Sequence, residues 1–215
     1  MKTVITIGRE YGSGGHQIGY LLAKKLNIPF YDDELLDRAA KDSGFAKEIL
    51  KTNDEKPTSS FLYSLVMDNS FGYTGSMFGD MNINQKVFLA QFEAIKHIAA
   101  EGPCVIIGRC ADYALDENPD LLSVFIYANQ EERIKRIAEK YNIPVKQAKD
   151  RIIKTDKKRS NYYNYYADRE WGRAQTYDLC INTSIFGIDG AVDAIINAVE
   201  IKEKGHEITL MNSTY

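Results

Sequence analysis

The residues best suited to chemistry form a glycine-rich turn near the start of the chain, Gly8-Arg9-Glu10-Tyr11-Gly12-Ser13-Gly14-Gly15-His16. The turn follows an apolar run at 3–7 that predicts a buried strand, and it leads into an apolar pattern with helical spacing. Glycines let an anion approach the backbone, and the N–H groups at a helix N-terminus favour negative charge. We therefore expect a phosphate site whose binding residues are Gly8, Gly12, Ser13, Gly14, Gly15 and His16.

This turn departs from the usual phosphate-binding pattern, GxxxxGK[ST]. Gly8 and Gly14 fit its two glycines, but Gly15 and His16 stand where lysine and a hydroxyl residue are expected. The lysine contacts the β- and γ-phosphates and the hydroxyl holds Mg²⁺, so phosphoryl transfer would need another cation. Arg9 is one candidate, and His16 is a weaker one because a neutral imidazole carries no charge. The alternative is a glycine-rich turn that binds no ligand; its place between strand and helix favours phosphate binding.

The elements that would position this turn alternate between strand and helix. Further strands are predicted at 28–31, 103–108, 121–127 and 177–182, and helices at 18–27, 35–40, 46–50, 61–66, 85–100, 131–140, 145–158 and 190–201. The stretch 68–80 is expected to be loop. Strands that are apolar almost throughout are typical of a parallel sheet covered on both faces. The pattern predicts an α/β domain with a five-stranded parallel sheet and helices on both faces.

Composition excludes several classes of protein. The 215 residues carry a formal net charge of −3, so there is no global basic field that would recruit nucleic acid. The three cysteines are far apart and include no CxxC pair, which argues against a zinc site or a disulfide framework. With no signal pattern after Met1 and no apolar run long enough to span a bilayer, we expect a cytoplasmic protein without membrane contact.

Three further segments place charged side chains where a ligand could bind. Tyr31-Asp32-Asp33-Glu34-Leu35-Leu36-Asp37-Arg38 follows the second strand, and Gly108-Arg109-Cys110-Ala111-Asp112 follows a buried one. Ligands of open α/β sheets bind outside the carboxyl ends of the strands, so Arg109 should point into the cleft. Lys154-Thr155-Asp156-Lys157-Lys158-Arg159-Ser160 adds local positive charge before a stretch rich in tyrosine.

In this order, the turn and the three segments resemble the cytidylate kinase-like family, relatives of cytidylate kinase with an altered phosphate loop. The resemblance covers most of the chain and is weakest from Gly44 to Asn84. It implies a P-loop NTPase-like fold with a helical acceptor-binding insert and a lid. The implied division of the single domain is a core of 1–32, 85–150 and 175–201, an insert of 33–84, a lid of 151–174 and a tail of 202–215.

The resemblance also implies roles for individual residues. Asp32, Arg38 and Arg109 would bind the acceptor; Asp33 stands where the family has serine, and Cys110 where it has aspartate. For Arg38 the alternative is a surface ion pair with Glu34 on the same helix, and acceptor binding is favoured over it.

Arg159 matches the lid arginine of an Asp-x-x-Arg motif that closes over the transferring phosphate. With Arg109 and Arg9 it forms the expected catalytic set. The alternative for this segment is a solvated basic helix whose tyrosines pack it against the core.

The expected activity is ATP-dependent phosphotransfer to a nucleoside monophosphate, cytidylate-like, or to a related small acceptor. Mg²⁺ would be bound through the phosphates, with no metal site made by the protein itself. Because Gly15 replaces the lysine, a nucleotide-binding or sensing protein with little or no activity is the alternative. Nucleic-acid binding by the stretch from Lys154 to Arg173 is a minor option, and a homo-oligomer is compatible with the tyrosine-rich surface.

Overall fold

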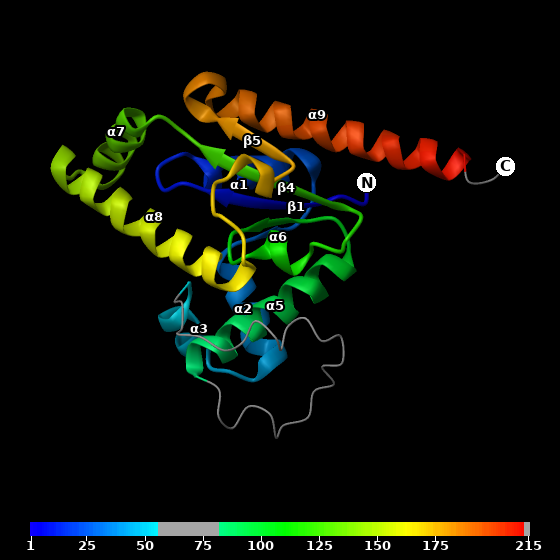
Figure 1. Ribbon diagram of the computed structural model, residues 1–215, viewed down its shortest axis with the longest axis horizontal. Coiled ribbons are helices and arrows are strands. Elements are labelled where there is room, and N and C mark those ends of the chain that lie inside the picture. Colours follow the sequence, from blue (N-terminus) through cyan, green and yellow to red (C-terminus); the bar gives the residue numbers. More distant parts are fainter. Residues whose placement is uncertain (56–81, 213–215) are drawn as a thin grey trace.

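The computed structural model describes residues 1–55 and 82–212, with side chains as far as Gly205. The predicted helix at 61–66 and the predicted loop at 68–80 lie outside the described residues. Five parallel strands form one sheet in the order β2-β3-β1-β4-β5 (Figure 1). The strands are β1 (Val4–Arg9), β2 (Phe30–Tyr31), β3 (Val105–Ile107), β4 (Leu121–Tyr127) and β5 (Leu179–Asn182).

Helices cover both faces of the sheet, as expected. They are α1 (Gly15–Leu26), α2 (Asp33–Ser43), α3 (Lys47–Asn53), α5 (Ile83–Glu101), α6 (Ala111–Ala114), α7 (Gln130–Tyr141), α8 (Val145–Ala167) and α9 (Thr183–Asn212), with a 3₁₀ turn at Ala174–Thr176. None of the helices in the described part of the chain has the length and apolar character needed to cross a membrane.

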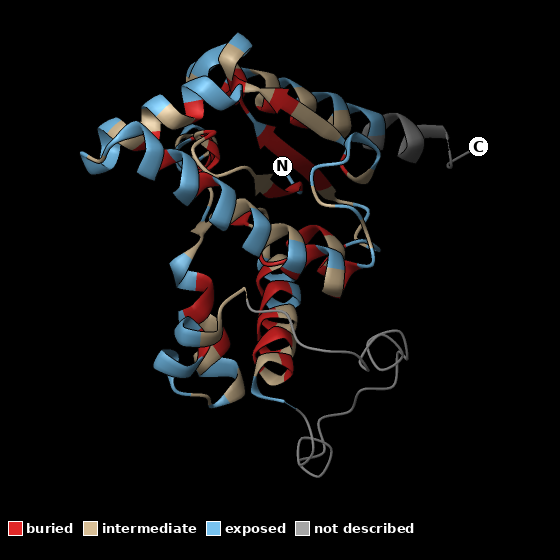
Figure 2. Ribbon diagram, turned by 60° about the vertical axis from the view of Figure 1, so that its left-hand side comes forward, coloured by how far each residue is buried: buried red, intermediate tan, exposed pale blue. Residues whose placement is uncertain are grey.

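Side chains that alternate along β1 supply the two layers of the core. Ile5 and Ile7 are fully buried and pack with α1 and α9, whereas Val4 packs with α2 and α5. Figure 2 shows the buried strands between the helices, with exposed residues on the outer helix faces. Because β1 lies at the centre of the sheet, the turn at its carboxyl end sits over the middle of the fold.

Two helices, α8 and α9, extend far beyond their predicted ranges. Helix α8 does not end near Lys158 but continues to Ala167, because Tyr162, Tyr163 and Tyr166 are buried instead of lying in a loop. These tyrosines join Phe88 of α5 in one aromatic cluster. The predicted lid, 151–174, therefore begins inside a continuous helix.

Helix α9 begins at Thr183, seven residues before the predicted start at 190. It kinks at Gly187, where φ is 65°. It also continues to Asn212 through the segment expected to be a polar tail, 202–215. The Glu203 carboxylate accepts hydrogen bonds from the Lys2 and Thr3 backbone N–H groups at 2.8 and 2.9 Å, and from the Thr3 hydroxyl. The helix thus holds the start of β1 in place.

Candidate functional site

The glycine turn lies between β1 and α1 and borders an open cleft of about 420 Å³. Gly12 and Gly14 adopt φ values of 85° and 90°, which favour glycine. Gly14 is the N-cap of α1, so the helix presents its positive end to the cleft. Gly15 and His16 also line the cleft. This arrangement can bind an anion through the backbone.

The outer side of the turn is fastened to the two helices that follow β4. The Tyr11 backbone N–H donates to the Asp156 carboxylate of α8 at 2.7 Å, and the Tyr11 carbonyl accepts from the Arg133 guanidinium of α7 at 2.9 Å. Arg133 and Asp156 also form an ion pair with each other. The Glu10 carboxylate bridges Arg133, at 3.1 Å, and the Ala128 backbone N–H, at 3.2 Å. The turn is therefore held before any ligand arrives.

Contacts of Arg136 and Ser13 determine which groups of the turn are available to a ligand. Arg136 of α7 donates to the Gly12 carbonyl at 2.5 Å and lines the cleft, which brings a guanidinium beside the turn. Ser13, expected to bind the ligand, is fully buried; its hydroxyl donates to the Glu10 carbonyl at 2.8 Å, and its carbonyl accepts from Thr183. Ser13 thus stabilises the turn and does not reach the cleft.

Arg9 takes the space that the missing lysine would need. A Cβ at Gly15 would lie 2.6 Å from the Cβ of Arg9, and a Cβ at Gly108 would lie 1.9 Å from the Arg9 Nη1 atom. The Arg9 side chain therefore runs through a passage that exists because both neighbours are glycine. No lysine could occupy position 15 without displacing Arg9.

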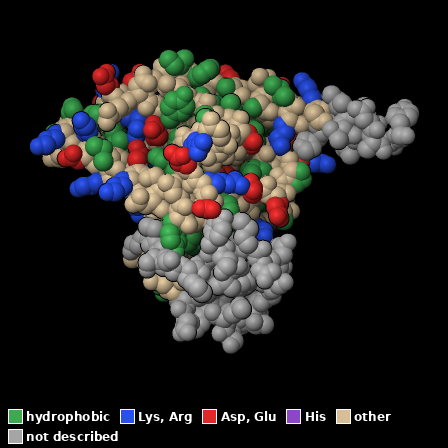
Figure 3. All heavy atoms as spheres, in the orientation of Figure 1, with side chains coloured by type: hydrophobic (Ala, Val, Ile, Leu, Met, Phe, Trp, Pro, Cys, Tyr) green, Lys and Arg blue, Asp and Glu red, His purple; other side chains and the backbone are tan. Residues whose placement is uncertain are grey.

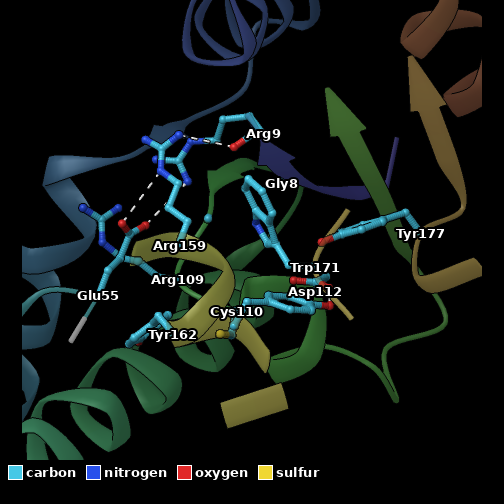
Figure 4. Close-up of a pocket in the computed structure, with 12 residues that line it drawn as sticks. Gly8, Arg9, Glu55, Arg109, Cys110, Asp112, Arg159, Tyr162, Trp171 and Tyr177 are labelled. Carbon is cyan, nitrogen blue, oxygen red and sulfur yellow. Dashed lines mark hydrogen bonds and ion pairs between the residues drawn. The ribbon is translucent and has the colours of Figure 1, made fainter. Parts of the chain in front are cut away.

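A second, smaller cavity of about 20 Å³ also borders Arg9 (Figure 4). Its walls come from the ends of β1 and β3, from α8 and from the aromatic residues that follow α8. Arg9 and Arg159 line both this cavity and the cleft. The two guanidinium groups therefore stand at the junction of the two spaces.

The charges at this junction are poorly matched. Burial, and then the neighbouring charge of Arg159, lower the pKa of Arg9 to about 10. Arg159 donates to the Arg9 carbonyl at 3.2 Å, but its buried Nε has no hydrogen-bond partner among the described residues. The Glu55 carboxylate faces both arginines, 3.8 Å from Arg9 and 3.9 Å from Arg159.

Arg109, by contrast, is fully paired within the protein. It forms a two-pronged contact with Asp54 at 3.1 and 3.0 Å and donates to the Asp32 carboxylate at 3.0 Å and carbonyl at 2.9 Å. Although burial opposes its charge, Asp54 and then Asp32 raise the pKa of Arg109. Its side chain is 4% exposed. Arg109 therefore lines the smaller cavity, but its guanidinium already donates hydrogen bonds to Asp54 and Asp32.

The remaining expected site residues fall into two places. Asp32 lines the cleft and its carboxylate is 3.3 Å from the exposed ring of His16. Arg38 does not line either cavity; it pairs with Asp42, four residues on, at 3.0 Å and with Glu101 at 2.6 Å. The structure thus gives Arg38 a surface ion pair, as in the alternative to acceptor binding, but its i,i+4 partner is Asp42 and not Glu34.

Polar and aromatic side chains close the far end of the smaller cavity. Asp112, whose pKa is raised by burial, accepts a hydrogen bond of 2.5 Å from the Tyr163 hydroxyl. The buried Tyr177 hydroxyl has no hydrogen-bond partner in the described chain. Trp171 packs edge-on against Phe125, with ring centroids 5.2 Å apart, and completes the wall.

Sequence reasoning missed four residues that shape the site: Asp54, Glu55, Arg133 and Arg136. Asp54 and Glu55 come from a segment with no recognisable motif. Arg133 and Arg136 were within a predicted charged helix, and their spacing of three places both on one helix face. Nothing in the sequence marked that face as the one toward the turn. Figure 3 shows other Lys and Arg side chains gathered at the end of the molecule where α7 and α8 lie.

The model of the cytidylate kinase-like family matches residues 4–185. A cytidylate kinase of Methanococcus aeolicus is 25% identical over 205 residues, which cover 94% of this chain and 99% of that protein. A cytidylate kinase of Archaeoglobus fulgidus is 26% identical over 204 residues, covering 93% and 96%.

Solved structures agree on the fold. An uncharacterized protein from Eubacterium ventriosum is 32% identical, with a TM-score of 0.70, and the match covers 93% of this chain and 99% of that one. Shikimate kinase from Bacteroides thetaiotaomicron, 16% identical with a TM-score of 0.53, covers 93% and 99%. The α/β, P-loop NTPase-like fold expected from the sequence is confirmed by these structures and by the sheet order.

Proposed function

Because the chain belongs to the cytidylate kinase-like family, we propose that it is an ATP-dependent phosphotransferase acting on a nucleoside monophosphate, cytidylate-like, or on a related small acceptor. Relatives and fold together support a kinase-type phosphotransferase. The observation that carries the proposal is the position of Arg9 and Arg159, which line both the cleft beside the turn and the smaller cavity. A phosphoryl group passing from one space to the other would pass these two guanidinium groups.

The donor nucleotide would place its phosphates against the backbone from Gly12 to His16. The φ values of Gly12 and Gly14 and the start of α1 fit an anion there, and Arg136 adds a nearby positive charge. Mg²⁺, when bound, would neutralise part of the phosphate charge. Its ligands would be the phosphates, because the Ser13 hydroxyl is turned into the loop.

Transfer would join an acceptor oxygen to the γ-phosphorus as the bond to the ADP oxygen breaks. Such reactions depend on positioning and on neutralising the three equatorial oxygens, so no strong base is required. Arg9, supported by the passage between Gly15 and Gly108, would replace the loop lysine. Arg159 would add the second positive charge.

A nucleotide-binding or sensing protein with little activity is the second candidate. Two observations favour it: the smaller cavity has a volume of about 20 Å³, and Arg109 is already paired with Asp32 and Asp54. On this reading the cleft binds nucleotide, but the acceptor space stays closed.

One assay separates the two candidates. ADP formation is measured with ATP, Mg²⁺ and a panel of nucleoside monophosphates, beside the variants Arg9→Gln and Lys25→Gln. We expect turnover with at least one acceptor, a loss of about 10²–10³ in kcat for Arg9→Gln, and parent activity for Lys25→Gln, whose exposed amine pairs with Asp193. Tight ATP binding without ADP formation across the panel would favour the sensing protein.

A further inference from the structure

The Glu55 carboxylate occupies the junction of the two cavities. It follows α3 and comes from the segment 33–84, and it is the one residue of that segment among the described residues that line the smaller cavity. Figure 4 shows it directed at the guanidinium groups of Arg9 and Arg159. Its side chain is 15% exposed, so the carboxylate is held inside the protein.

The contacts of Glu55 with the arginines are weak for such a position. The Glu55 carboxylate lies 3.8 Å from Arg9 Nη1 and 3.9 Å from Arg159 Nε. Both contacts are ion pairs that are too long to be hydrogen bonds. Arg159 Nε, buried beside it, has no hydrogen-bond partner among the described residues. Glu55 also has a φ of 52°, which is uncommon for a residue with a side chain. The Glu55 carboxylate therefore lies between the two arginines without forming a hydrogen bond to either of them.

Charge balance points the same way. Burial opposes the charge of Glu55, but Arg9, Arg159, Arg109 and Lys158 together lower its pKa, so the group is ionised. Arg109 is balanced separately by Asp32 and Asp54. Across the cluster three arginines therefore stand against three carboxylates, but Glu55 is the one carboxylate among the described residues that lies within 4 Å of Arg9 or Arg159. A phosphate monoester carries about −1.5 to −2 at neutral pH and three acceptor oxygens, so it would fit this place better than a carboxylate.

We propose that Glu55 is a specificity-determining residue that holds the place of the acceptor's anionic group, and that an acceptor must carry a phosphate to displace it. This proposal rests on the proposed function in one respect, namely that the ligand which displaces Glu55 is the phosphoryl acceptor. A cavity of about 20 Å³ has room for roughly one water molecule, so an acceptor must move side chains to enter. Acceptors with a hydroxyl or a single carboxylate cannot neutralise both arginines and are excluded.

The test uses the full chain without ATP and inorganic phosphate as the probe. Phosphate binding is measured by calorimetry and by thermal shift, at constant ionic strength, for the parent, Glu55→Gln and Glu101→Gln. The last is the matched control, because it removes the same charge from an exposed pair with Arg38. We expect Glu55→Gln to melt at a lower temperature in chloride, and to bind phosphate on the order of tenfold more tightly than the parent.

The control variant should bind phosphate as the parent does. Equal phosphate affinity in Glu55→Gln and the parent would overturn the proposal. So would tighter binding that persists in the double variant Glu55→Gln, Arg159→Gln, because phosphate would then be bound elsewhere. If Glu55→Gln does not fold in chloride, Glu55→Asp replaces it, and we expect an intermediate gain in phosphate affinity. A protein that shows these binding changes but forms no ADP would contradict the proposed function and not this proposal.

Discussion

At the scale of single residues, the site depends on side chains that glycine makes room for. Arg9 packs directly against Gly15, where an added Cβ would lie only 2.6 Å from the Cβ of Arg9. The same reasoning makes Gly14→Val a poor test of phosphate binding. A Cβ there would lie 2.4 Å from Ile188, at a φ of 90°, so the variant would disturb packing as well as the turn.

Gly15→Ala is the sharper change. The added methyl group would displace Arg9 from the junction, so we expect kcat to fall by at least about tenfold while ATP binding through the backbone of Gly12 and Gly14 is kept, since a misplaced charge costs transition-state stabilisation. ADP formation and ATP affinity are measured together. Gly205→Ala is the control, because a Cβ added at this helical glycine would meet no atom of the described residues within 4 Å. An unchanged rate in Gly15→Ala would show that Arg9 has no part in transfer.

At the scale of elements, helix α8 carries charge and aromatic packing on one continuous segment. Asp156 and Arg159 lie in its middle, and its last turns are anchored to α5. Phe88 stacks on Tyr166 with ring centroids 3.9 Å apart, and Tyr162 donates to Gln91 at 3.1 Å. The position of Arg159 therefore depends on aromatic contacts that never touch the cleft.

Phe88→Ala tests that dependence. Truncating this buried ring should lower the free energy of unfolding by about 3–5 kcal/mol. It should also reduce kcat, because α8 loses the contact that fixes Arg159. Urea unfolding and ADP formation measure the two effects. Phe186→Ala, at a ring that is 54% exposed, should change stability by less than about 0.5 kcal/mol. Full activity in a destabilised Phe88→Ala would show that α8 is positioned by other contacts.

The sequence predicted the elements whose patterns are local. Strand β4 was placed at its observed bounds, and α1 ends at Leu26, beside the expected stop at Asn27. Continuous apolar runs and helix-stop signals are sufficient for such elements. The length of α8 was missed because a run of tyrosines without an apolar period was read as a loop, and only contact with α5 shows it to be helix.

The candidate site was predictable to a lesser degree. The turn was predicted from residue type and spacing, and Arg159 from the resemblance to the family; the structure places both beside the same cleft. The pairing of Arg109 with Asp54 could not, because it joins residues 55 apart in sequence and Asp54 belongs to no motif. Arg38 was expected at the acceptor site because of the resemblance to the family. In the structure it pairs with the carboxylates of Asp42 and Glu101, away from both cavities.

At the scale of the whole molecule, the last helix is tied to the first strand. The Glu203 carboxylate accepts from the Lys2 and Thr3 backbone and from the Thr3 hydroxyl. Burial opposes its charge, but the hydrogen bonds from Thr3 and Lys2 prevail and lower the pKa of Glu203. Because β1 is central in the sheet, this contact supports the strand that carries the phosphate turn.

The pH dependence of stability should reveal this contact. A carboxylate with a lowered pKa in the folded state stabilises above its unfolded value of about 4.5. That stabilisation is lost as pH falls through the folded pKa. Glu203→Gln should therefore melt below the parent at neutral pH, with the two melting temperatures converging in acid. A difference that stays constant across the acidic range would show that the charge of Glu203 does not contribute.

The double attachment of α8 has a mechanical consequence. Asp156 fixes its middle to the phosphate turn through the Tyr11 backbone N–H, and the tyrosines fix its end to α5. A change in the orientation of α8 would therefore require at least one of these contacts to break. Ligand exchange that keeps both attachments would then proceed by displacement of side chains at the junction.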